Sequence, residues 1–171
     1  FSLNLNVLID GLMPKVCSIK EVLRAFLDHR QEVLIRRSQH RMDKIDHRLE
    51  VLEGFIIAFL NLDRVIDIIR YDDEPKAALM REDWSLDHVR AVNEADYKTP
   101  LPGDGELSDV QADAILNMRL RSLRRLEEIE LIRERDALMV ERAGLVDLLD
   151  SDTLQWQQIG RELEEIRNKF G

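Results

Sequence analysis

The chain has 171 residues, of which 44% are hydrophobic and 5% aromatic, and its 34 acidic side chains outnumber its 25 basic ones to give a net charge of −9. That charge excludes a protein that coats nucleic acid with a uniformly basic surface, and the aliphatic composition favours packed helices over a β-sandwich. No apolar run approaches the roughly 20 residues that a membrane span requires, and the lone Cys17 favours a reducing compartment.

The first elements in the chain are a hairpin and a long helix. Residues 1–17 alternate apolar and polar side chains around Asp10-Gly11, which predicts a β-hairpin with a tight turn. Ser18 and Glu21 have the spacing of a capping box, so a helix is expected over 18–61. Mainly apolar residues recur along this helix at spacings of three and four and form a stripe on one face, as in a coiled-coil seam. They are Ile35, Ser38, Met42, Ile45, Leu49, Leu52, Ile56 and Phe59. Because the chain opens on Phe1 rather than Met, we expect it to be a piece of a longer protein.

The most apolar run, GFIIAFL, ends this long helix and begins with Gly54. A glycine inside a helix costs about 1 kcal/mol in propensity, so we expect it to mark a point where another helix approaches closely. Two short helices should follow, one ending at Tyr71 and one that begins at Pro75. Residues 81–106 carry seven acidic and three basic side chains and are predicted to be a solvated loop, with one helical turn around Leu86 to Val92.

The second half of the chain returns to long helices. A second capping box at Ser108 and Gln111 predicts a helix to about Leu120 with a restart near Ser122. A returning helix is predicted over 127–150, and a final helix over 151–171 is capped by Ser151 or Asp152. The apolar stripe of this last helix comprises Trp156, Ile159, Leu163, Ile166 and Phe170. The predicted fold is therefore mainly α, with antiparallel coiled-coil arms (18–61 and 127–150) and a small helical head (62–126).

The candidates for catalytic or metal-binding groups are weak. Asp72, Asp73 and Glu74 offer oxygen ligands for Mg²⁺, but three adjacent acids after a helix more commonly form a cap and a solvated turn. Four histidines (His29, His40, His47 and His88) have no cysteine near them, which disfavours zinc. The chain also lacks a phosphate-binding G-x-x-x-x-G-K-[ST] motif. We therefore expect no metal or cofactor in this stretch.

Two long patterns resemble a known family. The segments RRSQHRMDKIDHRLEVLEGFIIAFLNLDRVIDIIRYDDEPKAALM and LSDVQADAILNMRLRSLRRLEE closely resemble the A subunit of bacterial DNA topoisomerase IV, and more loosely that of gyrase. The resemblance implies the end of the tower domain (1–17), the arms, and at their tip the exit gate, or C-gate, through which the dimer releases a transported duplex. The resemblance further implies a cytoplasmic, nucleoid-associated enzyme whose partner B subunit carries ATP and Mg²⁺.

The resemblance also implies site residues. We expect a homodimer through the head, with the contact made by Leu107, Ser108, Val110, Gln111, Ala114, Ile115, Met118 and Arg119. Arg36, Arg37, Arg41 and Lys44 could line the cavity for double-stranded DNA, although a solvated face with i,i+4 ion pairs is the alternative. Arg70-Tyr71 lacks the neighbours of the family's nucleophile, which is expected upstream of Phe1, so this stretch alone should be inactive.

Two alternatives remain open. Relative to the family, 81–106 looks inserted, and it is either a docking site for a regulatory protein or a tolerated insertion. The chain could also be a non-enzymatic coiled-coil homodimerisation module, against which the hairpin and the two long head patterns argue.

Overall fold

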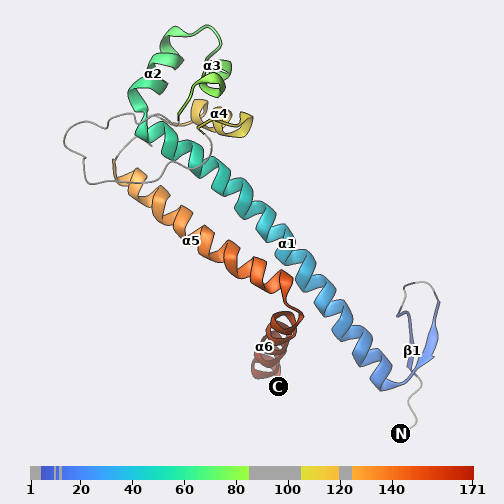
Figure 1. Ribbon diagram of the computed structural model, residues 1–171. Coiled ribbons are helices and arrows are strands. Elements are labelled where there is room, and N and C mark those ends of the chain that lie inside the picture. The colour runs from blue at the N-terminus through green and yellow to red at the C-terminus, as the bar shows by residue number, and fades with distance from the viewer. Residues whose placement is uncertain (1–4, 10, 12, 85–104, 120–124) are drawn as a thin grey trace. The chain divides into compact units, whose positions relative to one another are not determined.

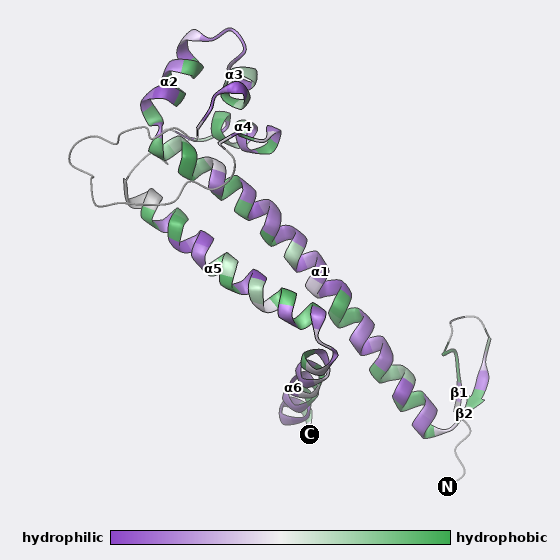
Figure 2. Cartoon of the chain, in the orientation of Figure 1, coloured by the Kyte–Doolittle hydropathy of each residue, from purple (hydrophilic) through white to green (hydrophobic). Residues whose placement is uncertain are grey.

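The computed structural model describes residues 5–9, 11, 13–84, 105–119 and 125–171 (Figure 1). The chain divides into two compact units, one formed by Phe1–Asp43 with Ala143–Gly171 and the other by Lys44–Arg142. The predicted fold class is confirmed, because the described elements are helices except for one small hairpin. Hydrophilic residues interrupt the hydrophobic ones along the long helices (Figure 2), and among the described residues no helix is long and apolar enough to cross a membrane.

The first unit begins with the predicted hairpin. Strands β1 (Leu5–Val7) and β2 (Lys15–Cys17) pair antiparallel, and Gly11 has a φ of 72°, in the left-handed region that glycine tolerates. The predicted capping box then starts α1 (Ile19–Leu60), because the Glu21 carboxylate accepts a hydrogen bond from the Ser18 N–H at 2.7 Å. Hydrogen bonds from the Ser18 N–H and hydroxyl lower the pKa of Glu21.

The predicted stripe of α1 is largely buried, with one shift at its start. Ile45, Leu52 and Ile56 are among the most buried side chains in the chain, whereas Ile35 is 39% exposed and the preceding Leu34 is buried instead. A straight helix has 3.6 residues per turn, so its buried face drifts relative to a 3.5-residue repeat. The buried position before Ser38 is therefore Leu34, four residues earlier, and not Ile35, three residues earlier.

The first unit also contains the end of α5 (Arg125–Asp150) and all of α6 (Asp152–Phe170). Ser151 caps α6 by accepting a hydrogen bond from the Leu154 N–H at 3.4 Å. Only part of the predicted α6 stripe is buried within this chain, since Ile159 is 2% exposed but Phe170 is 76% exposed. Polar contacts also join this helix to α1, since the Gln31 side-chain amide donates to Asp152 and to Gln155 at 2.8 Å.

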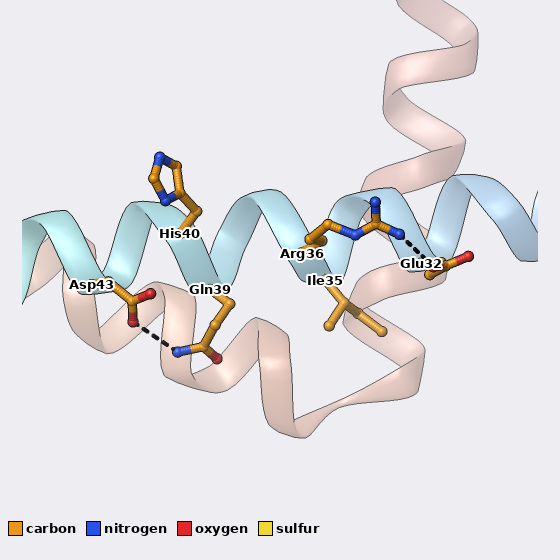
Figure 3. A pocket seen from close by; sticks show the side chains of 6 residues that line it. All are labelled: Glu32, Ile35, Arg36, Gln39, His40 and Asp43. Carbon is orange, nitrogen blue, oxygen red and sulfur yellow. Dashed lines mark hydrogen bonds and ion pairs between the residues drawn. The ribbon is translucent and has the colours of Figure 1, made fainter.

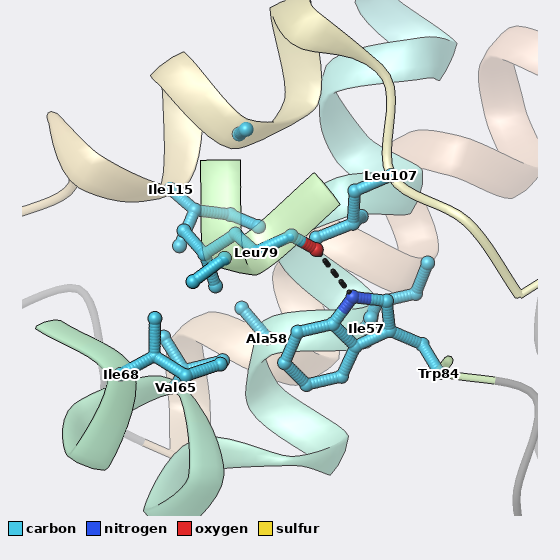
Figure 4. Packing of buried hydrophobic residues seen from close by; sticks show 10 residues of the cluster. Ile57, Ala58, Val65, Ile68, Leu79, Trp84, Leu107 and Ile115 are labelled. Atoms are coloured by element: carbon cyan, nitrogen blue, oxygen red, sulfur yellow. Dashed lines mark hydrogen bonds between the residues drawn. The ribbon is translucent and has the colours of Figure 1, made fainter. Parts of the chain in front are cut away.

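The second unit holds the head. Its helices are α2 (Leu62–Tyr71), α3 (Pro75–Arg81) and α4 (Asp109–Leu116), joined by the last part of α1 and the first part of α5. One apolar cluster connects α1, α2, α3 and α4 (Figure 4). Its buried members are Ile57, Ala58, Val65, Ile68, Ala78, Leu79, Trp84, Leu107, Ala112 and Ile115.

Two predictions for the head are wrong in part. The expected solvated loop over 81–106 begins with Arg81 inside α3, and its Trp84 is fully buried in the core. The helix expected to reach about Leu120 ends at Leu116, because the Met118 N–H donates to the Ile115 carbonyl oxygen at 3.1 Å, a tighter i→i−3 bond in place of the helical one. The predicted turn around Leu86 to Val92 and the restart near Ser122 lie outside the described residues.

Candidate functional site

Helix α4 has an inward and an outward face. Three of the residues predicted to make the dimer contact, Leu107, Gln111 and Ile115, are buried in their own chain. The others remain accessible: Ser108, Val110, Ala114 and Met118 are half-buried and Arg119 is exposed. Because side chains three or four positions apart share a helix face, Val110 and Ala114 lie together on the outward one. The surface that α4 offers to a partner is thus narrower than the predicted set.

The start of α4 lies directly against α1. A Cβ built on Gly54 would come within 2.9 Å of the Gln111 Cβ, so the two helices approach as only glycine allows. The Gln111 side-chain amide donates from Nε2 to the Glu50 carbonyl oxygen at 3.0 Å, and the Ser108 hydroxyl donates to the Glu50 carboxylate at 2.6 Å. The expectation that Gly54 marks a close helix approach is confirmed.

A bridge of three charges joins α4 to α3. Lys76 on α3 lies 2.7 Å from a carboxylate oxygen of Asp109 and 2.8 Å from one of Asp113. Hydrogen bonds to these two carboxylates raise the pKa of Lys76. Beside the bridge, a shallow groove of about 440 Å³ is lined by Pro75, Ala77 and Met80 together with charged neighbours. Helix α4 is therefore fixed on two sides, to α1 and to α3.

In the second unit, two ion pairs join α1 and α5. The guanidinium of Arg48 donates to both carboxylate oxygens of Glu134 at 2.8 Å, and Arg142 donates to Asp46 at 2.5 Å. As the numbering falls along α1 it rises along α5, so the two helices run antiparallel here. The hydrogen bond from Arg48 holds the pKa of Glu134 below its ordinary value.

The four predicted DNA-facing residues are exposed on α1. Arg36 pairs with Glu32 one turn earlier, which is the i,i+4 pairing of the alternative interpretation (Figure 3). Arg37 pairs instead with Glu162 of α6, as does Arg30 at 2.8 Å. Sequence reasoning missed Glu162, because a partner more than a hundred residues away leaves no local pattern.

The other candidate groups occupy ordinary structural positions. The Asp72 carboxylate accepts a hydrogen bond from the Glu74 N–H at 3.1 Å, so the acidic run serves the turn between α2 and α3. Tyr71 is the last residue of α2, is 74% exposed, and lies beside the guanidinium of Arg70. Across the described part of the chain, no three His, Cys, Asp or Glu side chains gather as metal ligands would.

Comparison with known proteins identifies the family. Residues 1–164 match the family of the A subunits of DNA gyrase and topoisomerase IV. The chain therefore belongs to this gyrase and topoisomerase IV family, as the resemblance implied.

Individual relatives agree with this assignment. Over 98% of its length the chain is 45% identical to the A subunit of DNA topoisomerase 4 from Caulobacter vibrioides, and over 99% it is 42% identical to that from Rickettsia bellii. It is 31% identical over 99% of its length to the A subunit of DNA gyrase from Buchnera aphidicola. The chain spans about one fifth of these relatives, covering 19% of the first and 20% of the other two.

Proposed function

We propose that this chain is the exit-gate region of the breakage-reunion subunit of an ATP-dependent bacterial DNA topoisomerase. Two copies would meet through the outward face of α4 and hold the dimer together while double-stranded DNA is cut and passed. The observation that carries this proposal is the division of α4, which has one face in the core of its own chain and Val110 and Ala114 outside it.

The division of α4 suits a contact that must open repeatedly. The inward face remains in the core when the partner leaves, so opening the gate requires no unfolding. At about 25 cal/mol per Å², a contact of several hundred Å² per partner contributes several kcal/mol before the cost of association. Such a contact is strong enough to hold a dimer and weak enough to release it.

The whole enzyme would relax and decatenate DNA in the cytoplasm and so serve chromosome segregation. ATP and Mg²⁺ would be bound by the partner B subunit, which would act together with the A subunit. The exposed basic residues on α1, Arg36 and Lys44 in particular, would face the transported duplex and contact its phosphates transiently. The stretch described by this sequence would have no activity alone, because the nucleophilic tyrosine would lie in another part of the enzyme.

The test places a charge on the outward face of α4 in the full-length protein. Val110→Asp should raise the dissociation constant of the dimer about tenfold or more and abolish decatenation. In a two-fold symmetric contact both copies carry the substitution, so two carboxylates would be buried without partners. Sedimentation and a decatenation assay with the B subunit measure both effects. The matched control is Val140→Asp, since Val140 is 75% exposed on α5. If the two variants dimerise equally well, the proposal is wrong.

A further inference from the structure

We propose that Gln111, together with Gly54 and Glu50, is a positioning residue that makes the gate helix α4 move as one body with α1. This inference rests on the proposed function, because it concerns how the exit gate is attached to its arm. Gln111 is almost fully buried in its own chain, so its role lies in holding α4 and not in contacting a second copy.

The two capping boxes of this chain reveal what is special about Gln111. In the first, Ser18 and Glu21 satisfy each other at the exposed start of α1. In the second, Gln111 accepts from the Ser108 N–H at 2.9 Å with its Oε1 and donates to the Glu50 carbonyl oxygen at 3.0 Å with its Nε2. A glutamate would close the second box equally well, but an ionised carboxylate has no N–H to donate to α1. The glutamine therefore joins two helices as well as capping one.

The orientation of the amide follows from its partners. The Ser108 N–H requires an acceptor and the Glu50 carbonyl oxygen requires a donor, so only one orientation of the Gln111 amide satisfies both. The Ser108 hydroxyl adds a third link through its 2.6 Å hydrogen bond to the Glu50 carboxylate. All three bonds converge on the first turn of α4.

Gly54 permits this geometry. A Cβ at position 54 would lie 2.9 Å from the Gln111 Cβ and 3.3 Å from its Cα, so it would push the α4 backbone away and lengthen the amide bond to Glu50. Gly144 on α5 and Gly160 on α6 have nothing within 4 Å of a built Cβ. The three glycines sit inside helices, and only the one at the α1–α4 contact is required by a close approach.

The mechanical consequence concerns how the gate opens. If α4 is locked onto α1, a movement of the arm carries the outward face of α4 with it, and two copies separate at their contact. If the lock is loose, force applied to the arm is absorbed by α4 shifting on α1, and the arm no longer controls the gate.

The experiment uses the whole enzyme, with its B subunit present, carrying the variant Gln111→Glu, which keeps the cap and removes the donor. We expect the amides of α4 to exchange hydrogen about tenfold faster while those of α5 are unchanged. Decatenation should fall about tenfold, with DNA cleavage by the same enzyme within twofold of the unaltered protein. Gly54→Ala should have the same effects, because both changes loosen one contact.

The controls repeat each change where no second helix is involved. Glu21→Gln exchanges the same two residue types in the other capping box, and Gly144→Ala fills an open glycine; both should leave exchange in α4 and decatenation unchanged. Equal exchange and equal decatenation in Gln111→Glu and Glu21→Gln would overturn the proposal. Loss of protection in α5 as large as in α4 would also overturn it, because Gln111 would then be a general stabiliser.

The outcome can be separated from that of the proposed function. If Val110→Asp weakens the dimer while Gln111→Glu leaves α4 exchange and decatenation unchanged, the positioning role is wrong and the exit gate stands. If Val110→Asp has no effect on the dimer, the exit gate itself is wrong, and so is a positioning role that depends on it. Should Gln111→Glu fail to fold, Gln111→Met removes the donor without adding a charge and is judged by the same two measurements.

Discussion

Trp84 donates its indole N–H to the carbonyl oxygen of Leu79 at 2.9 Å, and both side chains are fully buried. The backbone N–H of Trp84 donates to the carbonyl oxygen of Gly105 at 2.7 Å, which joins the chain after α3 to the chain before α4. The indole thus closes the core of the head and satisfies a carbonyl group at the end of a short helix, where backbone acceptors lack helical partners.

The first prediction concerns this tryptophan. Trp84→Ala should lower the free energy of unfolding by about 3–5 kcal/mol through lost burial and a cavity. Trp84→Phe should cost less, and part of its cost comes from leaving the Leu79 carbonyl oxygen without its donor. Urea unfolding measures both, and Trp156→Phe on α6, where the side chain is 38% exposed, is the control. Equal losses at the two tryptophans would contradict the assigned role of Trp84.

The second prediction concerns pH. Burial on its own would raise the pKa of Glu162, but hydrogen bonds from Arg37 and Gln158 and the charges of Arg37 and Arg30 outweigh it, so the pKa is lowered. A lowered folded pKa means that the stabilisation is fully present above the unfolded value of about 4.3 and is lost as pH falls through the folded value. Thermal unfolding between pH 6 and pH 3 should therefore show a weaker pH dependence for Glu162→Gln. Glu164→Gln, at an exposed position of the same helix, is the matched control, and an equal loss of pH dependence in the two variants would contradict the prediction.

The third prediction concerns the ion pair between α1 and α5 in the second unit. The side chains of Arg48 and Glu134 are 44% and 41% exposed, so water and salt screen their attraction. A double-mutant cycle with Arg48→Met and Glu134→Gln should give a coupling of about 0.5–1 kcal/mol, the upper part of the range for exposed pairs because the contact is bidentate. The coupling should shrink in 1 M salt. A salt-independent coupling would show that the pair acts through packing instead.

The fourth prediction concerns the basic face of α1. In the whole enzyme, removing charge with Arg36→Gln and Lys44→Gln should slow strand passage several-fold and make its rate less sensitive to salt, because fewer phosphates are contacted. DNA cleavage should be unaffected. Arg37 is left unchanged because it pairs with Glu162. Arg161→Gln, on the exposed face of α6, is the matched control. Relaxation and decatenation at the unaltered rate would exclude a role of these residues in passage.

Local patterns predict the elements that local interactions form. Both capping boxes begin helices where Ser18 and Ser108 indicate, and the Pro75 helix begins at its proline, because each signal acts within a few residues. Gly54 is also informative. A glycine inside a helix lowers the stability of that helix, and a close contact with a second helix offsets this cost.

Longer-range contacts are not predictable in the same way. Trp84 lies among acidic residues in the stretch 81–106. The average composition of that stretch predicts a solvated loop and does not indicate that one aromatic side chain belongs to the core. The prediction assigns Leu107, Gln111 and Ile115 to a partner because an apolar helix face does not tell which surface covers it. The structure buries them in the core of their own chain, so the dimer contact proposed above would have to use the neighbouring positions.

The places of the two units in the sequence decide which unit is fully synthesised first. The unit Lys44–Arg142 is one continuous stretch, whereas the other unit combines Phe1–Asp43 with Ala143–Gly171. Arg30 and its partner Glu162 are separated by 132 positions, which a ribosome adding about 5–20 residues per second covers in roughly 7–26 s. During that interval Arg30 has no Glu162 with which to pair. The nested unit can therefore fold before Ala143–Gly171 has been synthesised, whereas the discontinuous unit is complete only after that stretch has emerged.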